Sequence, residues 1–498
     1  MHGLAPIKRR RSIARGASAV VALLGILLAA LLVNALRLRS RQVDVTPAEK
    51  MSLDEMALAE RLAQALRFRT ISHQEPGRTD RSEFLNLIQF FEDTYPRVHA
   101  SLRLERVNDL SLLYTWPGTD PSLRPILLMA HLDVVPVEPG SEGKWKYPAF
   151  EGRIAEGYVW GRGAMDDKVG VLAILEAVDL LLAAGYRPRR SIYFAFGHDE
   201  EVSGHAGAAR IAELLGSRDV HLDFVIDEGS AGTRGVLPML DAPLALVGTA
   251  EKGYLTLELS VSSEGGHSSM PPPQTAAGIV AAAVTALQES PMPARLAGPA
   301  EDLLLAVSPE LSLGRRLVLA NLWLFGPMIK WQLSQNPSSN ATLRTTTAPT
   351  MMEGSAKENV LPQRARAVVN FRILPGDSVS GVLQHAREVI DDPRVEIKAL
   401  GVPQEPSARS STQARGFGVL SRTIREIFPG AVVAPALVLG ATDARHYAAH
   451  SDDVYRFLPL WVTPEDLSRI HGTNERISVE GFAQCVRFYR QLLLNADG

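Results

Sequence analysis

Short apolar runs alternate with helix-like patterns along the first half of the chain. The runs at 125–130, 191–196 and 224–226 are apolar at most positions, which is typical of strands buried on both faces. Residues 169–184 lie between two of these runs, have the length of a helix and end at Gly185. This alternation of strand and helix patterns predicts an α/β domain with a mostly parallel sheet that is covered by helices.

The pattern changes near residue 255. An alternating strand is followed by an Ala-rich helix over 275–287 and a strand over 365–373, which we interpret as an inserted α+β domain. Strand-like residues return at 432–439, and a helix over 478–494 closes the chain. We therefore expect one main domain built from two segments with a second domain between them, divided as 50–250, 251–400 and 401–498.

The N-terminus carries an uncharged, mostly apolar stretch over residues 16–36, with basic clusters on both sides. In a helix, this stretch would be about 30 Å long, enough to cross a bilayer. A cleaved signal peptide, which would leave a secreted protein, is the alternative, but its apolar region usually has only about 7–15 residues. The cluster within 1–15 is the richer one, so we expect a cytoplasmic tail, a single transmembrane anchor and a main body on the non-cytoplasmic side.

Composition excludes several classes of protein. Hydrophobic residues make up 46% and charged residues 21% of the chain, which is typical of a globular protein. The net charge of −3 provides no excess positive charge for a phosphate backbone, so we expect no nucleic-acid partner. Cys485 is the single cysteine, which excludes an internal disulfide and a zinc finger. Any metal must be held by His, Asp and Glu.

Acidic and histidine side chains follow each of the three buried runs. His131 and Asp133 follow the first, Glu200 and Glu201 the second, and an Asp-Glu pair at 227–228 the third, while Asp166 ends a Gly-rich turn before the helix. Each feature alone has an ordinary explanation, such as a structural histidine, a solvated surface or a turn. Together they lie where open α/β sheets bind ligands. Divalent cations would offset the repulsion among so many carboxylates, and the donors fit zinc, with manganese or cobalt as substitutes.

Four ordered motifs carry a resemblance to a known family: Ala-His-Leu-Asp-Val-Val-Pro at 130–136, Gly-Arg-Gly-Ala-Met-Asp-Asp-Lys at 161–168, Asp-Glu-Glu-Val-Ser-Gly at 199–204 and Gly-Gly-His-Ser-Ser at 265–269. The chain resembles the aminoacylase and carboxypeptidase family of dinuclear zinc hydrolases (peptidase family M20). Further motifs, including His-Gly-Thr-Asn-Glu at 471–475, are similar to those of the branch that contains carboxypeptidase S and the secreted N-fatty-acyl amino acid synthase/hydrolase. The resemblance runs from about residue 50 to the C-terminus.

The resemblance implies a zinc-peptidase catalytic domain, an inserted lid or dimerisation domain, and two Zn²⁺ per subunit. His131 would bind one zinc, and Asp166 would bridge both. Glu201 and His471 would complete the second zinc. The first zinc would also take a carboxylate from the Asp-Glu pair, for which the branch favours Asp227, with Glu228 as a rival.

The resemblance also assigns roles around the metals. Glu200 would be the general base that activates a zinc-bridging water, and Asp133 would orient His131. Physical chemistry supports the role of Asp133, because residues i and i+2 of an extended chain share a face and a metal-bound imidazole needs such a partner. The peptide after Asp166 is expected to be cis. His267 would reach the active site from the lid, sometimes across a homodimer.

Substrate recognition is expected to involve arginine, whose planar guanidinium matches a free carboxylate. Arg372 and Arg445 are the candidates, although each could instead be a surface residue paired with a neighbour such as Asp443. Asn340 and Asn359 are weaker candidates for polar contacts in the lid.

Residues 317–331 form a strongly apolar segment that Pro327 interrupts. It is too short for a second span. Its ordinary interpretation is a buried helix pair in the lid, and the alternatives are a wall for an acyl chain or a surface that touches the membrane.

The predicted function is hydrolysis of the amide bond of N-acyl amino acids or of C-terminal peptide bonds. Both substrate classes fit the sequence. The alternative is a membrane-tethered binding protein that kept the fold without the chemistry. Because every ligand and base position is filled, the enzyme is the favoured hypothesis.

Overall fold

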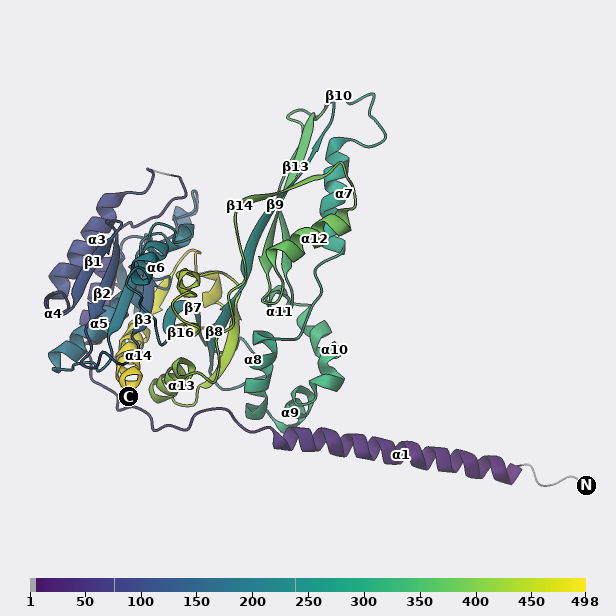
Figure 1. Ribbon diagram of the computed structural model, residues 1–498, viewed down its shortest axis with the longest axis horizontal. Coiled ribbons are helices and arrows are strands. Elements are labelled where there is room, and N and C mark those ends of the chain that lie inside the picture. Colours follow the sequence, from purple (N-terminus) through teal and green to yellow (C-terminus); the bar gives the residue numbers. More distant parts are fainter. Residues whose placement is uncertain (1–5, 76, 238) are drawn as a thin grey trace, which may run out of the picture.

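The computed structural model describes residues 6–75, 77–237 and 239–498, in which a main domain, a smaller second domain and a long N-terminal helix are distinct (Figure 1). The main domain is built on an eight-stranded sheet of order β1-β2-β6-β3-β7-β16-β8-β15. β3 is parallel to β6 and β7, β7 to β16, and β8 to β15, so the predicted α/β class is confirmed. The strands are β1 (Arg103–Val107), β2 (Ser111–Trp116), β3 (Ile126–His131), β6 (Ile192–Gly197), β7 (Val225–Thr233), β8 (Leu244–Glu251), β15 (Val432–Val438) and β16 (Val454–Val462).

Both faces of this sheet are covered, which explains the continuous apolar runs. In β3, Leu128 and Ala130 enter the larger core beneath α2 (Glu55–Ala65), α5 (Lys168–Ala183) and α14 (Val479–Asp497). Leu127 and Met129 enter a second core beneath α6 (Ala208–Gly216). Because every position of the strand is buried, the sequence shows no alternation there.

The second domain has its own sheet and its own core. β9 (Gly253–Ser262), β11 (Thr346–Glu353), β13 (Arg364–Ile373) and β14 (Glu396–Gln404) form an antiparallel sheet of order β11-β13-β9-β14. Helices α7 (Ala276–Glu289) and α12 (Val379–Ile390) cover it, and apolar side chains of β9 and β13 fill the space between. A short ladder of β10 (Gly266–His267) and β12 (Val360–Leu361) lies at the far tip (Figure 1). This is the expected α+β insert.

A helical insert connects the second domain to the edge of the main sheet. It comprises α8 (Pro299–Val307), α9 (Leu313–Leu319), α10 (Leu322–Leu333) and α11 (Pro337–Leu343). Helix α8 packs on β15, and side chains of α8 to α10 share a small core with β8 and β15. Ile329 is the single buried residue of α10, so the expectation of a buried helix pair does not hold for this helix.

The N-terminal helix α1 (Pro6–Arg37) extends away from the body (Figure 1). Its segment Ala19–Arg37 is long and apolar enough to cross a membrane. Residues 1–5 of the predicted basic tail lie outside the described residues. The chain after α1 is held at the sheet edge, where the Gln42 side chain donates to the Val433 carbonyl oxygen (2.9 Å) and accepts from the Val433 N–H (2.8 Å).

Candidate metal centre and active site

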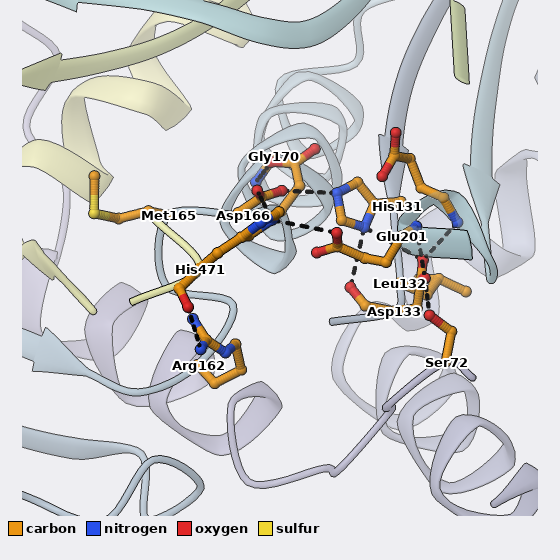
Figure 2. A network of polar contacts seen from close by, with 12 residues as sticks. Ser72, His131, Leu132, Asp133, Arg162, Met165, Asp166, Gly170, Glu201 and His471 are labelled. Carbon is orange, nitrogen blue, oxygen red and sulfur yellow. Dashed lines mark hydrogen bonds and ion pairs between the residues drawn. The ribbon is translucent and has the colours of Figure 1, made fainter. Parts of the chain in front are cut away.

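Four of the predicted ligands come from segments far apart in sequence and meet at the carboxyl ends of strands β3 and β6: His131, Asp166, Glu201 and His471 (Figure 2). His131 is the last residue of β3, and Glu201 lies in the short helical turn that follows β6. Asp166 precedes α5, whose first turn is capped by the Asp167 carboxylate accepting from the Gly170 N–H (3.1 Å). The peptide between Asp166 and Asp167 is cis, as expected.

The C-terminal segment closes this site. Strand β17 (Arg476–Ser478) pairs antiparallel with β5 (Tyr158–Trp160), which places the preceding loop with His471 beside the loop of Asp166. His471 has a left-handed backbone with φ 58°. A Cβ on the next residue, Gly472, would lie 2.1 Å from the Ser468 carbonyl oxygen, so the turn requires glycine there.

Four side chains form the centre of the cluster. His131 Nε2 lies 2.9 Å from Asp166 Oδ1, and His471 Nε2 lies 3.0 Å from Asp166 Oδ2. His471 Nε2 is also 3.2 Å from Glu201 Oε2. Ligand atoms of His131, Asp166 and Glu201 all lie within 4.8 Å of one another. Asp166 thus contacts the two imidazoles through different oxygens, the arrangement that a bridging carboxylate needs.

The pKa values of these side chains reflect the close packing of the cluster. Burial lowers the pKa of His131, but its hydrogen bonds with Asp133 and Asp166 outweigh that effect and hold the pKa well above its usual value. Contacts with Asp166 and Glu201 raise the pKa of His471 to about 10. Both imidazoles thus pair with carboxylates of the cluster. Glu201 Oε1 is buried without a hydrogen-bond partner among the described residues, so it is available to a cation.

Asp133 organises two parts of the site from a fully buried position. Its Oδ1 lies 3.3 Å from His131 Nδ1 and accepts the Glu200 N–H (3.1 Å). Its Oδ2 accepts the Glu201 N–H (3.1 Å) and the Ser72 hydroxyl (2.6 Å; Figure 2). His131 Nδ1 also lies 3.0 Å from the backbone carbonyl oxygen of Asp133, so this residue orients the imidazole through both its backbone and its carboxylate, and the carboxylate holds the turn that carries Glu200 and Glu201.

The two side chains of the Asp-Glu pair in β7 lie in different surroundings. Asp227, which the resemblance favoured, accepts the Ala444 N–H (2.7 Å) with one oxygen. Burial raises the pKa of Glu228 well above its usual range, and the negative charges of Asp166, Asp227, Glu200 and Asp167 add to this shift. Successive residues of a strand face opposite sides, so only one of the two can face the cluster. The charges of Asp166 and Glu200 act on Glu228, which supports the rival ligand, and the choice between Asp227 and Glu228 stays a prediction.

Glu200 has the surroundings of a general base. Burial raises the pKa of its carboxyl well above the usual range, and the negative charges of Asp443, Glu201 and Asp166 add to the shift. A glutamate with a raised pKa accepts a proton and returns it more readily than one in water.

Two structural features of the site are absent from the sequence predictions. Arg162 and Glu475 form a buried ion pair, with Arg162 Nη1 2.6 Å from Glu475 Oε2. Asp443 is buried, and neither of its oxygens has a hydrogen-bond partner among the described residues. All three residues lie inside recognisable sequence motifs. Arg162 and Glu475 are far apart in sequence, and Asp443 has no hydrogen-bond partner among the described residues, so no local sequence pattern indicates either feature.

The two candidate arginines lie near each other where the second domain meets the main domain. Arg372 stacks on Tyr254 with 4.9 Å to the ring centroid, and burial together with the charge of Arg445 lowers its pKa. Arg445 donates to Gln404 Oε1 (3.2 Å) and does not form the ion pair with Asp443 considered above. Neither arginine is paired with a carboxylate in the described part of the chain. Nearby Lys252 has a pKa of about 8 because of burial and the charge of Arg372.

His267 is not brought to this site within one chain. It lies exposed in β10 at the far tip of the second domain, where its Nδ1 is 2.8 Å from Ser269 Oγ (Figure 1). The backbone carbonyl of Asn359 accepts from Ser268 at the same tip (3.1 Å), and Asn340 lies in α11. His267 and Asn359 could approach a metal centre only by a large domain movement or from a second copy, whereas Asn340 precedes Ala341, whose carbonyl oxygen accepts from Lys252.

Comparisons with known proteins agree with this geometry. The model of "Peptidase family M20/M25/M40" matches residues 127–495. A "probable carboxypeptidase S-like 2" of Dictyostelium discoideum is 42% identical over 487 residues, which cover 95% of this chain and 93% of that protein. An N-fatty-acyl-amino acid synthase/hydrolase of Xenopus tropicalis is 42% identical over 445 residues, with 88% and 86% covered. The crystal structure of human carnosine dipeptidase 1 shares the fold, with a TM-score of 0.63 and 17% identity over 89% of this chain and 96% of that chain.

Proposed function

Because the chain belongs to peptidase family M20/M25/M40, it is a hydrolase of amide bonds, and we propose that its substrates are N-acyl amino acids. The observation that carries this proposal is the pair Arg372 and Arg445, buried or half-buried cations without a carboxylate partner in the described chain, beside a His–carboxylate cluster. A free substrate carboxylate would supply the missing charge. C-terminal peptide bonds are the second candidate, because they end in the same carboxylate and a relative is named for carboxypeptidase S.

The donor set fits two divalent cations, with zinc as the proposed metal and Mn²⁺ or Co²⁺ as substitutes. His131 and Glu228 would hold the first, Glu201 and His471 the second, and Asp166 would bridge them. The unpartnered Glu201 Oε1 supports this fit. When bound, the pair supplies polarisation of the scissile carbonyl and a lowered pKa of the attacking water.

The remaining chemistry belongs to protein side chains. Glu200 accepts the proton of the attacking water and delivers it to the leaving nitrogen, so that the amine departs uncharged. Asp133 keeps His131 in one orientation and holds the Glu200 backbone in place through its N–H. Arg372 and Arg445 fix the carboxylate end of the substrate.

The proposed arrangement in the cell follows from α1. The helix would anchor the protein in the membrane with residues 1–15 in the cytoplasm and the catalytic domain on the other side. A homodimer formed through the second domain would bring His267 of one chain toward the site of another, a role that this residue cannot fill from its position in its own chain.

A hydrolysis panel on the full-length, metal-loaded protein tests the proposal. N-acyl amino acids of increasing chain length, matching dipeptides and carboxyl-methylated controls would be compared by release of the free amine. Each methylene buried contributes about 0.8 kcal/mol, so four extra carbons can raise kcat/KM by up to roughly 100-fold if an apolar surface receives the chain. A flat series with faster dipeptide cleavage would favour the carboxypeptidase activity. Binding without hydrolysis of any substrate would favour the non-catalytic alternative.

A further inference from the structure

The helical insert exposes large apolar side chains on one helix and its neighbour. Trp323 and Trp331 of α10 are 63% and 67% exposed, and Leu324, Met328 and Leu313 are exposed with them. Large exposed apolar patches are uncommon on soluble domains and indicate a binding surface. We define these five residues as the α9–α10 apolar surface.

Helix α9, which leads into α10, lies beside the C-terminal end of α1 (Figure 1). Asn321, at the junction of α9 and α10, is fully buried and donates to the carbonyl oxygen of Leu31 (3.1 Å). The Asn34 side chain donates to Asn321 Oδ1 (2.8 Å), and Trp323 Nε1 donates to the same oxygen (3.2 Å). The insert is therefore attached to α1 by specific hydrogen bonds, and Leu31 is buried against it.

The position of these hydrogen bonds along α1 indicates how deep they would lie in a membrane that α1 spans. Leu31 lies five residues before Leu36, the last residue of the uncharged stretch 16–36. At 1.5 Å per residue, this is about 7.5 Å toward the middle of the apolar segment. If that segment occupies the hydrocarbon of a bilayer, the α9–α10 junction lies in its outer half, next to the interface where tryptophan side chains are enriched in membrane proteins.

Charge is consistent with a lipid surface. No Asp or Glu occurs between Glu310 and Glu353, a segment that includes Arg315, Arg316 and Lys330. The insert therefore does not repel anionic headgroups, and basic residues near the surface are attracted to them.

We propose that the α9–α10 apolar surface docks into the lipid bilayer beside α1, in the leaflet that faces the catalytic domain. This inference rests on the membrane anchor of the proposed function. The bilayer then holds the insert, which ends in α11. At the end of α11, Lys252 Nζ donates to the carbonyl oxygens of Ala341 and Arg344 (2.9 Å each), so the insert is linked to the arginine pair. Docking would fix the orientation of the arginine pair relative to the membrane, a favourable position for substrates that carry an acyl chain.

Spin labels on the full-length chain test the docking. The native Cys485 is fully buried, so single cysteines at other positions can be labelled selectively. Met328→Cys and Trp331→Cys are the test variants. Met270→Cys and Val402→Cys are matched controls, because these residues are 78% and 70% exposed and lie outside the α9–α10 apolar surface. Each variant would be reconstituted into vesicles of phosphatidylcholine and phosphatidylglycerol, and retention of hydrolytic activity would confirm its folding.

The readout is collision of each label with dissolved oxygen, which concentrates in lipid, and with a water-soluble nickel chelate. We expect oxygen to dominate at 328 and 331 and the nickel chelate to dominate at 270 and 402. Nickel accessibility at both test positions equal to that of the controls, in protein that floats with the vesicles, would overturn the docking alone. Dipolar broadening between labels would show that a second copy covers the surface and would also overturn it. Protein that does not float would overturn the anchor, and with it the docking.

Discussion

Replacement of Glu475 by glutamine should loosen the metal site without removing a proposed ligand. Glu475 is fully buried, and its Oε1 accepts the N–H groups of Met165 (2.7 Å) and Asp166 (3.2 Å). Its Oε2 pairs with Arg162, which in turn donates to the carbonyl oxygens of His471 and Gly472 (3.1 Å each). The pair therefore joins the two loops that carry Asp166 and His471.

The magnitude follows from burial. Glutamine has nearly the same shape but no charge, so Glu475→Gln leaves the Arg162 guanidinium, which is 2% exposed, without a counter-charge. Removal of one partner from a buried ion pair typically costs about 3–5 kcal/mol of the free energy of unfolding. Loss of a residue that supports metal ligands typically costs about 10–100-fold in metal affinity, which corresponds to roughly 1.4–2.8 kcal/mol.

Thermal melting and competition with a chromogenic chelator would measure the two effects. Glu353→Gln is the matched control, because Glu353 pairs with Arg366 at 2.7 Å on the surface of the second domain, with side chains 50% and 32% exposed. A surface pair contributes about 0–1 kcal/mol, so the control should differ little from wild type. If Glu475→Gln melts like the control and binds metal with wild-type affinity, the pair does not hold the two loops.

Four further substitutions test individual roles. Glu200→Gln should keep both metals yet lose about 10²–10⁴-fold in kcat, and near-normal turnover would remove Glu200 from the mechanism. Glu228→Gln should lower the metal content measured by elemental analysis, whereas Asp227→Asn should retain it; the reverse result would restore Asp227 as the ligand. Arg372→Met should lower kcat/KM for N-acyl amino acids by about 10–150-fold, the effect of losing one charged hydrogen bond. It should change little for carboxyl-methylated analogues, and an equal loss on both would show that Arg372 has only a structural role.

Much of the fold follows directly from the sequence. Strands β3, β6, β7 and β15 appear as apolar runs because the sheet is covered on both faces, as the two cores around Leu128 and Met129 show. β1 has no such run because most of its side chains stay partly exposed at the sheet edge. The candidate ligands His131, Asp166 and His471 could be proposed because they stand in ordered motifs that resemble those of a known family; His131 ends a strand, Asp166 precedes a helix and His471 lies in a loop.

Tertiary structure alone decided which side chains meet. Asp227 and Glu228 are adjacent in sequence, and only the packing of β7 determines which of them faces Asp166. Arg162 and Glu475 are 313 residues apart, so their pairing leaves no local pattern. An apolar stretch such as α10 has the same composition whether it is buried in protein or exposed to lipid. In the structure, Asn321 joins the α9–α10 junction to α1, and Trp323 and Trp331 of α10 remain exposed.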